Sequence, residues 1–496
     1  MADTNNTNIV TRFAPSPTGF LHVGGLRTAL YSYLLAKKSG GRFILRIEDT
    51  DRARTVPGGV ENILTSLSWA GVNPDEGVIL RDGEASESGA NGPYTQSHRL
   101  EIYKKYADEL VAKGNAYYCF CTADRLAQVK EDRQANKLPP GYDGHCKNLS
   151  KEEVENKLKN GDNHVIRLAM PDDGVCTFHD LIRGEVSFKY SDVDDQVLLK
   201  SDGFPTYHLA VVVDDHHMQV SHVVRGEEWI SSTPKHIYLY ECLGWTPTLF
   251  AHLPLLLNSD RSKLSKRQGD VAVLDYKEKG YLPEALLNFV AFLGWNPGDE
   301  REMFTLDELV SEFSLEKVNK AGAVFNIEKL DWYNREYLKK LDDEKLLKYI
   351  DTFMPEVARN SVNYKNILPR LMHTLLERIS KGSEIAETYT ENISYFFEKE
   401  KIDEGMLVWK SLKDNPNALD ITRGYIAEAR AILEGMPVES WDDREAIKGA
   451  LWPLTEKYGR GEVLWPLRVS LSCRDKSPDP FELCYILGRE EVLNRI

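Results

Sequence analysis

The 496-residue chain has few cysteines and no long apolar run, and each lack excludes a class of protein. Seven cysteines are an odd and sparse set, so the sequence predicts a protein of a reducing compartment without a disulfide framework. No uninterrupted apolar stretch approaches the roughly 20 residues that cross a bilayer, so a membrane protein is not expected. The start, MADTNNTNIV, has neither the apolar core of a signal peptide nor the Arg-rich pattern of a transit peptide. We therefore expect the cytoplasm, and an organellar matrix is left open for a processed form.

The chain also lacks an excess of positive charge. Its formal net charge of −15 disfavours a protein that coats nucleic acid without specificity. It leaves open a specific nucleic-acid partner, because a basic track on an acidic surface can bind while the acidic remainder suppresses non-specific contacts. With 42% hydrophobic residues the chain can form cores, and its length suggests about three or four domains.

The first clear pattern is a strand, a loop, a helix and a second strand. Residues 9–13 are typical of a short strand, apolar residues between Leu26 and Leu34 recur at helical spacing, and residues 42–49 are again typical of a strand. The loop between them, residues 12–25, is punctuated by proline and glycine. In an open α/β sheet, ligands bind at the carboxyl end of such a strand, beside the helix N-terminus that attracts anions.

This loop lacks both common phosphate-binding patterns, G-x-x-x-x-G-K-[ST] and G-x-G-x-x-G. It instead places His22 before Gly24 and Gly25, a donor and two residues that let a nucleotide approach the backbone. Far along the chain, Lys263 and Lys266 bracket a polar loop that suits a polyphosphate. Each motif alone is compatible with an ordinary capped turn or a solvated basic loop.

Together, HVGG and KLSKR resemble the HIGH and KMSKS signatures of class I aminoacyl-tRNA synthetases. Further blocks occur in the expected order: RFAPSPTGFLHVGG, LRIEDTD, DGFPTYHLA, VVRGEEWISSTPKH, LNFVAFLGW and KLDWYN. The chain is thereby similar to the glutamyl-tRNA synthetases of bacterial and organellar type. The APSPTG…HVGG form differs from that of glutaminyl and eukaryotic cytosolic relatives.

The resemblance implies an α/β fold with a helical tail. We expect a discontinuous Rossmann-type catalytic domain in residues 1–104 and 204–262, with an inserted α/β domain for the tRNA acceptor end in residues 105–203. A helical stem-contact region with the KLSKR loop would follow in residues 263–341, and an all-helical anticodon-binding domain in residues 342–496.

The implied activity is ligation of L-glutamate to the 3′ end of glutamate tRNA, through a glutamyl-adenylate formed from ATP. Mg²⁺ would arrive with ATP, held largely by phosphates and water. Two alternatives stay open: an enzyme that also charges glutamine tRNA with glutamate, and an inactive tRNA-binding regulatory relative. A monomer without a membrane partner is expected.

For the chemistry, the resemblance implies that His22, Lys263 and Lys266 are catalytic, because they would stabilise charge on the reacting phosphates and the departing pyrophosphate. The implied ATP site is larger and is formed by Ser16, Thr18, His22, Gly24, Gly25, Glu228, Trp229, Lys263 and Lys266.

Glutamate carries one ammonium and two carboxylates, so its site needs an anion and at least two cations or donors. The implied residues are Arg12, Ala14, Ser16, Glu48, Tyr207 and Arg225. Arginine can bind a carboxylate bidentately, and Glu48 is the expected ammonium partner. The alternative for the two arginines is a surface ion pair. Val211 departs from the family pattern, because many relatives have a polar amide there.

Three cysteines have zinc-like spacing: Cys119, Cys121 and Cys146. A structural zinc needs a fourth ligand. The usual family position holds Asn148, a poor ligand, so Tyr142 or His145 would have to substitute, and we take Tyr142. Zinc and three reduced thiols without metal both stay open.

Two further groups attract attention. Residues 214–217 (Asp-Asp-His-His) are metal-ligand types, but neighbours on a strand or turn point in different directions, so a structural turn is predicted. In the helical tail, four residues could contact nucleic acid: Arg370, His373, Arg378 and Lys381. Arg378 lies about where the family's anticodon-reading arginine would fall, and a solvated helix face is the alternative.

Overall fold

The computed structural model describes residues 8–137, 141–264, 272–398 and 401–496. The chain forms two compact units. The first comprises Met1–Lys277 and Pro283–Leu330, and the second comprises Glu278–Leu282 and Asp331–Ile496. No helix within the described residues has both the length and the apolar character needed to span a membrane.

The first unit contains an eight-stranded sheet in the order β4-β3-β2-β1-β10-β11-β7-β8. Its centre is parallel, from β3 to β7, and antiparallel hairpins form both edges. The strands are β1 (Val10–Phe13), β2 (Arg42–Leu45), β3 (Glu76–Arg81), β4 (Glu84–Ser88), β7 (Val175–Asp180), β8 (Gly184–Lys189), β10 (His222–Gly226) and β11 (Leu249–Leu253). Such a doubly covered parallel sheet explains why the central strands are buried.

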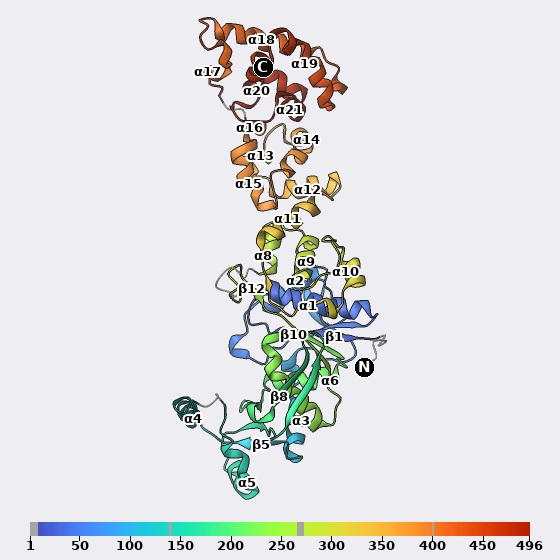
Figure 1. Cartoon of the computed structure of the whole chain (residues 1–496), viewed down its shortest axis with the longest axis vertical. Coiled ribbons are helices and arrows are strands. Elements are labelled where there is room, and N and C mark those ends of the chain that lie inside the picture. Colours follow the sequence, from blue (N-terminus) through green and yellow to red (C-terminus); the bar gives the residue numbers. More distant parts are fainter. Residues whose placement is uncertain (1–7, 138–140, 265–271, 399–400) are drawn as a thin grey trace. The chain divides into compact units, whose positions relative to one another are not determined.

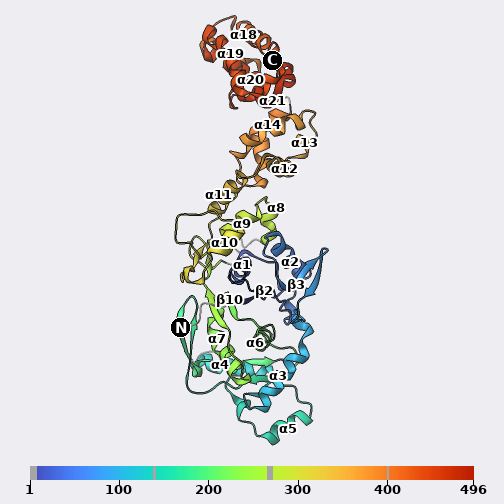
Figure 2. The ribbon, with the colours of Figure 1, turned by 90° about the vertical axis from the view of Figure 1, so that its right-hand side faces the viewer.

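Helices cover both faces of this sheet. In two perpendicular views, β10 lies between α1 on one side and α6 on the other (Figure 1, Figure 2). The longer helices up to the KLSKR loop are α1 (Val23–Lys38), α2 (Gly59–Trp69), α3 (Leu100–Ala112), α4 (Ala123–Ala135), α5 (Lys151–Lys159), α6 (Tyr207–His217) and α7 (Thr233–Leu243). Those that follow are α8 (Val273–Glu278), α9 (Pro283–Ala291), α10 (Leu306–Glu312) and α11 (Ile327–Leu338).

The βαβ unit predicted from the sequence is present. In α1 the residues Leu26, Ala29, Leu30 and Leu34 are fully buried, which is the stripe that the helical spacing predicted. The helix ends at Lys38 with Ser39 as its C-cap, and Gly40 follows with φ +68°, a conformation that glycine adopts without strain. The second strand is shorter than predicted, because β2 ends at Leu45 rather than at residue 49.

A smaller antiparallel sheet, β5-β6-β9, lies within the range predicted as the inserted domain. Its strands are β5 (Ala116–Cys119), β6 (Val165–Leu168) and β9 (Val197–Leu199). The β7–β8 hairpin lies in the same range, yet β7 pairs with β11 of the main sheet through Asp180 and Phe250. Residues 175–189 therefore form one edge of the main sheet. A third pair, β12 (Leu256–Leu257) and β13 (Ala323–Val324), joins the chain before the KLSKR loop to residues near 320.

The second unit is helical around its own apolar core. Its helices are α12 (Asp343–Phe353), α13 (Glu356–Arg359), α14 (Tyr364–Leu376), α15 (Ile385–Thr388), α16 (Ser394–Phe397), α17 (Glu404–Leu407), α18 (Ala418–Glu434), α19 (Arg444–Tyr458), α20 (Arg460–Ser472) and α21 (Pro480–Arg495). A single π-helical turn, Tyr389–Ile393, connects α15 to α16. The predicted change from an α/β fold to helices is confirmed.

Candidate active site

A cavity of ≈ 750 Å³ lies at the carboxyl ends of β1 and β10, where a parallel sheet commonly binds its ligand. Its wall includes each described residue predicted for ATP or glutamate: Arg12, Ala14, Ser16, Thr18, His22, Gly24, Gly25, Glu48, Tyr207, Arg225, Glu228, Trp229 and Lys263. Lys266, predicted beside Lys263, lies outside the described residues. Segments more than 200 residues apart in the sequence thus form one site.

His22 is the N-cap of α1. Its Nδ1 accepts a hydrogen bond from the backbone N–H of Gly25 at 3.3 Å. A neutral His22 therefore carries its proton on Nε2, which is a donor suited to a phosphate oxygen. A Cβ at Gly24 would lie 3.1 Å from the His22 ring, and one at Gly25 would lie 2.7 Å from Leu21. Gly24 therefore leaves room for the His22 ring at the positive end of the helix, and Gly25 leaves room for the Leu21 side chain.

Arg12 and Glu48 are connected by buried ion pairs. Arg12 donates from Nε to Asp215 at 3.2 Å, and Arg46 donates to Asp215 at 2.7 Å and to Glu48 at 3.0 Å. Arg46 is fully buried between the two carboxylates. Burial raises the pKa of Glu48, and the attraction of Arg46 and Arg12 opposes only part of this effect. The network holds a carboxylate and a guanidinium in fixed places on the cavity wall.

Asp214, next to Asp215 in the sequence, forms an ion pair with another buried arginine, Arg99. It accepts hydrogen bonds from Arg99 at 2.7 Å, from Gln96 at 2.9 Å and from the hydroxyl of Tyr103 at 2.9 Å. The predicted turn at residues 214–217 is wrong, because these residues form the last turn of α6. The helix directs both acids to buried arginines, Asp214 to Arg99 and Arg46 and Asp215 to Arg12 and Arg46, which a local pattern does not reveal.

Arg225, on β10, is held by neutral groups. Its N–H groups donate to Nε2 of His252 (3.0 Å), the hydroxyl of Tyr207 (3.2 Å), Nδ1 of His236 (3.1 Å), Oγ1 of Thr233 (2.9 Å) and the carbonyl of Trp229 (3.4 Å). Tyr207 and Trp229 line the cavity with Arg225, and their ring centroids lie 4.2 Å apart. Burial raises the pKa of Tyr207, which keeps its hydroxyl protonated as a donor.

Lys263 lies at the base of the KLSKR loop. Leu264 donates its N–H to the carbonyl of Leu256 at 2.9 Å, and Leu257 forms a β-bridge with Lys263. Since Leu256 belongs to β12, the pairing of β12 with β13 sets where the loop begins. At the carboxyl end of β10, a Cβ at Gly226 would lie 2.2 Å from the carboxylate of Glu228, a flexible side chain that also lines the cavity.

Val211 does not face the cavity. It is buried in α6, packs in an apolar cluster and is absent from the cavity wall. In this chain the position therefore contributes to the core.

Several residues important to the site were not identified from the sequence. They are Arg46, Gln96, Asp215, His236 and His252, all buried. One signal was available for Arg46, since a charged residue interrupts the apolar run RFILRIED. Lys200 and Thr50 also line the cavity.

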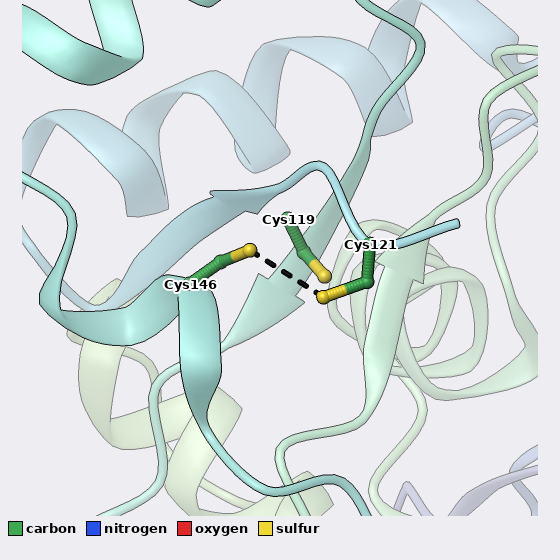
Figure 3. Close-up of side chains that lie close together, drawn as sticks. All are labelled: Cys119, Cys121 and Cys146. Atoms are coloured by element: carbon green, nitrogen blue, oxygen red, sulfur yellow. Dashed lines mark hydrogen bonds between the residues drawn. The ribbon is translucent and has the colours of Figure 1, made fainter. Parts of the chain in front are cut away.

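The three cysteines meet as the spacing predicted. The Sγ atoms of Cys119, Cys121 and Cys146 all lie within 4.8 Å of one another (Figure 3). The Tyr142 hydroxyl lies 3.4 Å from Cys119 and 3.3 Å from Cys121. Thiolates about 2.3 Å from a tetrahedral zinc are ~3.8 Å apart, close to the 3.6 Å between Cys121 and Cys146. The three thiols therefore have the spacing of a group that could hold a metal ion.

Cations adjoin this cluster. The Arg167 guanidinium lies 4.0 Å from the centroid of the Tyr142 ring, and Arg125 approaches Cys121 at 3.6 Å. Positive groups of this kind offset the excess negative charge of several anionic ligands around one divalent ion.

The candidate nucleic-acid residues of the helical unit have different partners. Arg370 pairs with Asp442, His373 lies 3.2 Å from Asp343, and Lys381 lies 2.9 Å from Asp331. Arg378 is exposed and donates to the neutral side chain of Asn392 at 3.3 Å, in the π-helical turn.

Comparisons with known proteins agree with this fold. Residues 8–332 match the family model described as "tRNA synthetases class I (E and Q), catalytic domain", and residues 325–496 match "Anticodon binding domain". A glutamate–tRNA ligase of Clostridioides difficile is 46% identical over 99% of this chain and 98% of its own, and one of Finegoldia magna is 45% identical over 99% of both. A crystal structure of a glutamate–tRNA ligase of Elizabethkingia meningosepticum, in complex with its amino acid, superposes with a TM-score of 0.85 at 37% identity, covering 98% of each chain.

Proposed function

Since the chain belongs to the glutamate–tRNA ligase family of class I synthetases, we propose that the cavity at β1 and β10 activates glutamate. The family activity is the charging of tRNA with glutamate. A carboxylate oxygen of glutamate attacks the α-phosphorus of ATP and pyrophosphate leaves. A ribose hydroxyl of the terminal tRNA nucleotide then attacks the acyl carbon and AMP leaves.

Glutamate would bind between two cations and one anion. Arg12 and Arg225 would bind its carboxylates, and Glu48 would bind its ammonium group. Tyr207 would donate from its hydroxyl, and Ala14 and Ser16 would line the pocket. The support is that these six residues share one cavity wall although their partners come from separate elements.

The nucleotide would lie toward the N-terminus of α1. His22 would donate to a phosphate, and Gly24 and Gly25 would let it approach the backbone. Lys263, with Lys266, would neutralise the departing pyrophosphate. Ser16, Thr18, Glu228 and Trp229 would complete the site. The protein's contribution is thus positioning and charge stabilisation, and Mg²⁺ would come with ATP.

A structural zinc is the second part of the proposal. Cys119, Cys121, Cys146 and Tyr142 would hold it, and zinc would crosslink the end of β5 to the turn at His145–Asn148. His145 and Asn148 are not needed, because the Tyr142 hydroxyl already lies beside the thiols.

We also assign Arg378 to tRNA binding. Of the four candidate cations in the helical unit, it is exposed and its described hydrogen bond is to an amide rather than an acid. An exposed guanidinium without an acidic partner keeps its charge for phosphates and base edges. Action as a monomer, placement in the cytoplasm and the domain boundaries remain predictions from the sequence.

The observation that carries the proposal is the convergence of His22, Lys263 and both arginines on one cavity. The decisive assay is charging of purified glutamate and glutamine tRNAs with labelled L-glutamate. We expect charging of the glutamate tRNA and a loss of about 10²–10³-fold in His22→Ala. Charging of glutamine tRNA as well would identify a non-discriminating enzyme. Charging of neither, by a folded protein, would overturn the proposal.

A further inference from the structure

The two arginines of the proposed glutamate pocket are held in different ways. Arg12 is paired with the carboxylate of Asp215. The hydrogen bonds of Arg225 go to two imidazoles, two hydroxyls and a carbonyl, which are all neutral. Within the part of the chain that the structure describes, Arg225 forms no ion pair, although it is only 5% exposed.

We propose that His236 and His252 are positioning residues that hold Arg225 through uncharged acceptors, which leaves its positive charge for a carboxylate of the substrate. The inference rests on the proposed function, because it takes Arg225 to be part of the glutamate pocket. It concerns residues that do not themselves line the cavity.

The hydrogen-bond directions require His252 to be neutral. A guanidinium has no acceptor, so Nε2 of His252 must accept from Nε of Arg225 at 3.0 Å. The ring proton is then on Nδ1, which donates to Asp180 at 2.6 Å. Asp180 also accepts backbone N–H groups of Ile182 and Arg183. Asp180 therefore fixes the tautomer of His252 and reaches Arg225 only through the imidazole.

His236 is fixed in the same way from the other side. Its Nδ1 accepts from Nη1 of Arg225 at 3.1 Å, so its proton is on Nε2 and is donated to Nδ1 of His208 at 3.0 Å. Protonating either His236 or His252 at the accepting nitrogen would set two donors against each other. His208 and Asp180, the second partners of the two rings, thus keep both imidazoles as neutral acceptors.

The chemical consequence concerns charge. A direct carboxylate partner would also fix the guanidinium, but it would cancel part of the attraction for an incoming anion. Neutral acceptors give the same orientation while the cation stays uncompensated in a buried wall. The arrangement suits recognition of a substrate that brings its own negative charge.

The test compares variants that differ in charge and hardly in shape. His236→Glu places a carboxylate beside Arg225, and His236→Gln places a neutral acceptor of similar reach there. We would measure ATP–pyrophosphate exchange by the full chain in the presence of glutamate tRNA, varying L-glutamate and then ATP. We expect the KM for glutamate to be at least about tenfold higher in His236→Glu than in His236→Gln, with kcat within about threefold. The KM for ATP should be equal in the two variants.

A second pair of variants, at Thr233, keeps the test valid if the His236 variants fail to fold. Thr233 is the first residue of α7 and lies 2.9 Å from Nη2 of Arg225. The side chains introduced by Thr233→Asp and Thr233→Asn have nearly the same shape and differ in charge. An acid is tolerated well at a helix N-terminus. The same difference in KM for glutamate should appear between these two, with equal thermal stability.

The outcomes separate the two proposals. If the unmodified chain activates glutamate, but the members of each pair have equal KM values for it, the neutral-acceptor inference is overturned and the proposed function stands. If the unmodified chain does not activate glutamate, the proposed function itself fails. A rise in the KM for ATP equal to that for glutamate would also contradict the inference, because a merely structural effect would not separate the substrates.

Discussion

Asp215 accepts a hydrogen bond from Arg12 across 203 positions of the sequence, at 3.2 Å and with both side chains 4% exposed. The same carboxylate accepts from Arg46, which in turn donates to Glu48. One acid on α6 therefore connects the ends of β1 and β2, and it sets the geometry of two residues on the cavity wall.

Replacing this acid should destabilise the fold strongly. In Asp215→Asn two buried guanidiniums lose their shared counter-charge, so we expect the free energy of unfolding to fall by about 3–5 kcal/mol. Calorimetry or urea unfolding measures it. The control is Asp108→Asn, because Asp108 pairs with Lys104 on an exposed helix face and should cost no more than about 0.5 kcal/mol. A loss below about 1 kcal/mol in Asp215→Asn would contradict this account.

The contrast between Arg12 and Asp215 shows what the sequence could predict. Arg12 follows from its place at the end of a strand in a recognisable motif. The role of Asp215 does not follow, because a helix had to form at residues 207–217 before its carboxylate could point at β1. Local patterns give periodicity and the ends of elements, so the βαβ unit and the cavity could be predicted.

Partners of buried charges come from tertiary packing instead. His252 and Arg225 lie on adjacent parallel strands, and their contact depends on the register of β10 with β11. The place of the β7–β8 hairpin at the edge of the main sheet could likewise not be predicted. The sheet that a strand joins depends on its pairing partners and not on its own sequence. The cysteine cluster was predictable, since three thiols at short spacing constrain one another.

Low pH should destabilise the first unit, which contains the cavity, through its buried histidines. Burial lowers the pKa of His208 to about 3, and nearby Lys235 and Arg225 add to the effect. The unfolded chain, with a pKa near 6.5, then binds one more proton than the folded chain between these values, so stability is present above pH 6.5 and is lost as the pH falls. From pH 7 to 5, His208 should account for about 2 kcal/mol.

His208→Gln removes this titration and keeps an acceptor for His236. We expect its unfolding free energy to fall by about 2 kcal/mol less than that of the unmodified chain over the same pH range. Equal pH dependence in the two proteins would show that His208 is protonated with an ordinary pKa in the folded state.

Metal content tests the cysteine cluster. The purified chain should contain about one zinc per molecule, and Cys146→Ser should lose most of it, because removal of one ligand leaves a site of three. Cys176→Ser is the matched control, since Cys176 is a buried thiol outside the cluster. A strong chelator should lower the melting temperature of the parent and leave that of Cys146→Ser nearly unchanged. A zinc-free parent purified in zinc-supplemented medium would establish three reduced thiols.

The helical unit offers a test that separates binding from folding. Arg378 is exposed beside Asn392, whereas Arg370 pairs with Asp442 and donates to the carbonyl of Tyr485 at 3.2 Å. Arg378→Gln should therefore raise the KM for tRNA by roughly 5–150-fold, which corresponds to about 1–3 kcal/mol of contact energy, without lowering the melting temperature.

Arg370→Gln should do the reverse, because its guanidinium joins α14 to α21 and the turn at Asp442. We expect a lower melting temperature and a KM for tRNA within about twofold of the parent. Glutamate and ATP kinetics should be unchanged in both, since the cavity lies in the other unit. If Arg378→Gln behaves like Arg370→Gln, the exposed guanidinium is a solvated helix face and the anticodon reader must be sought among other cations of the unit.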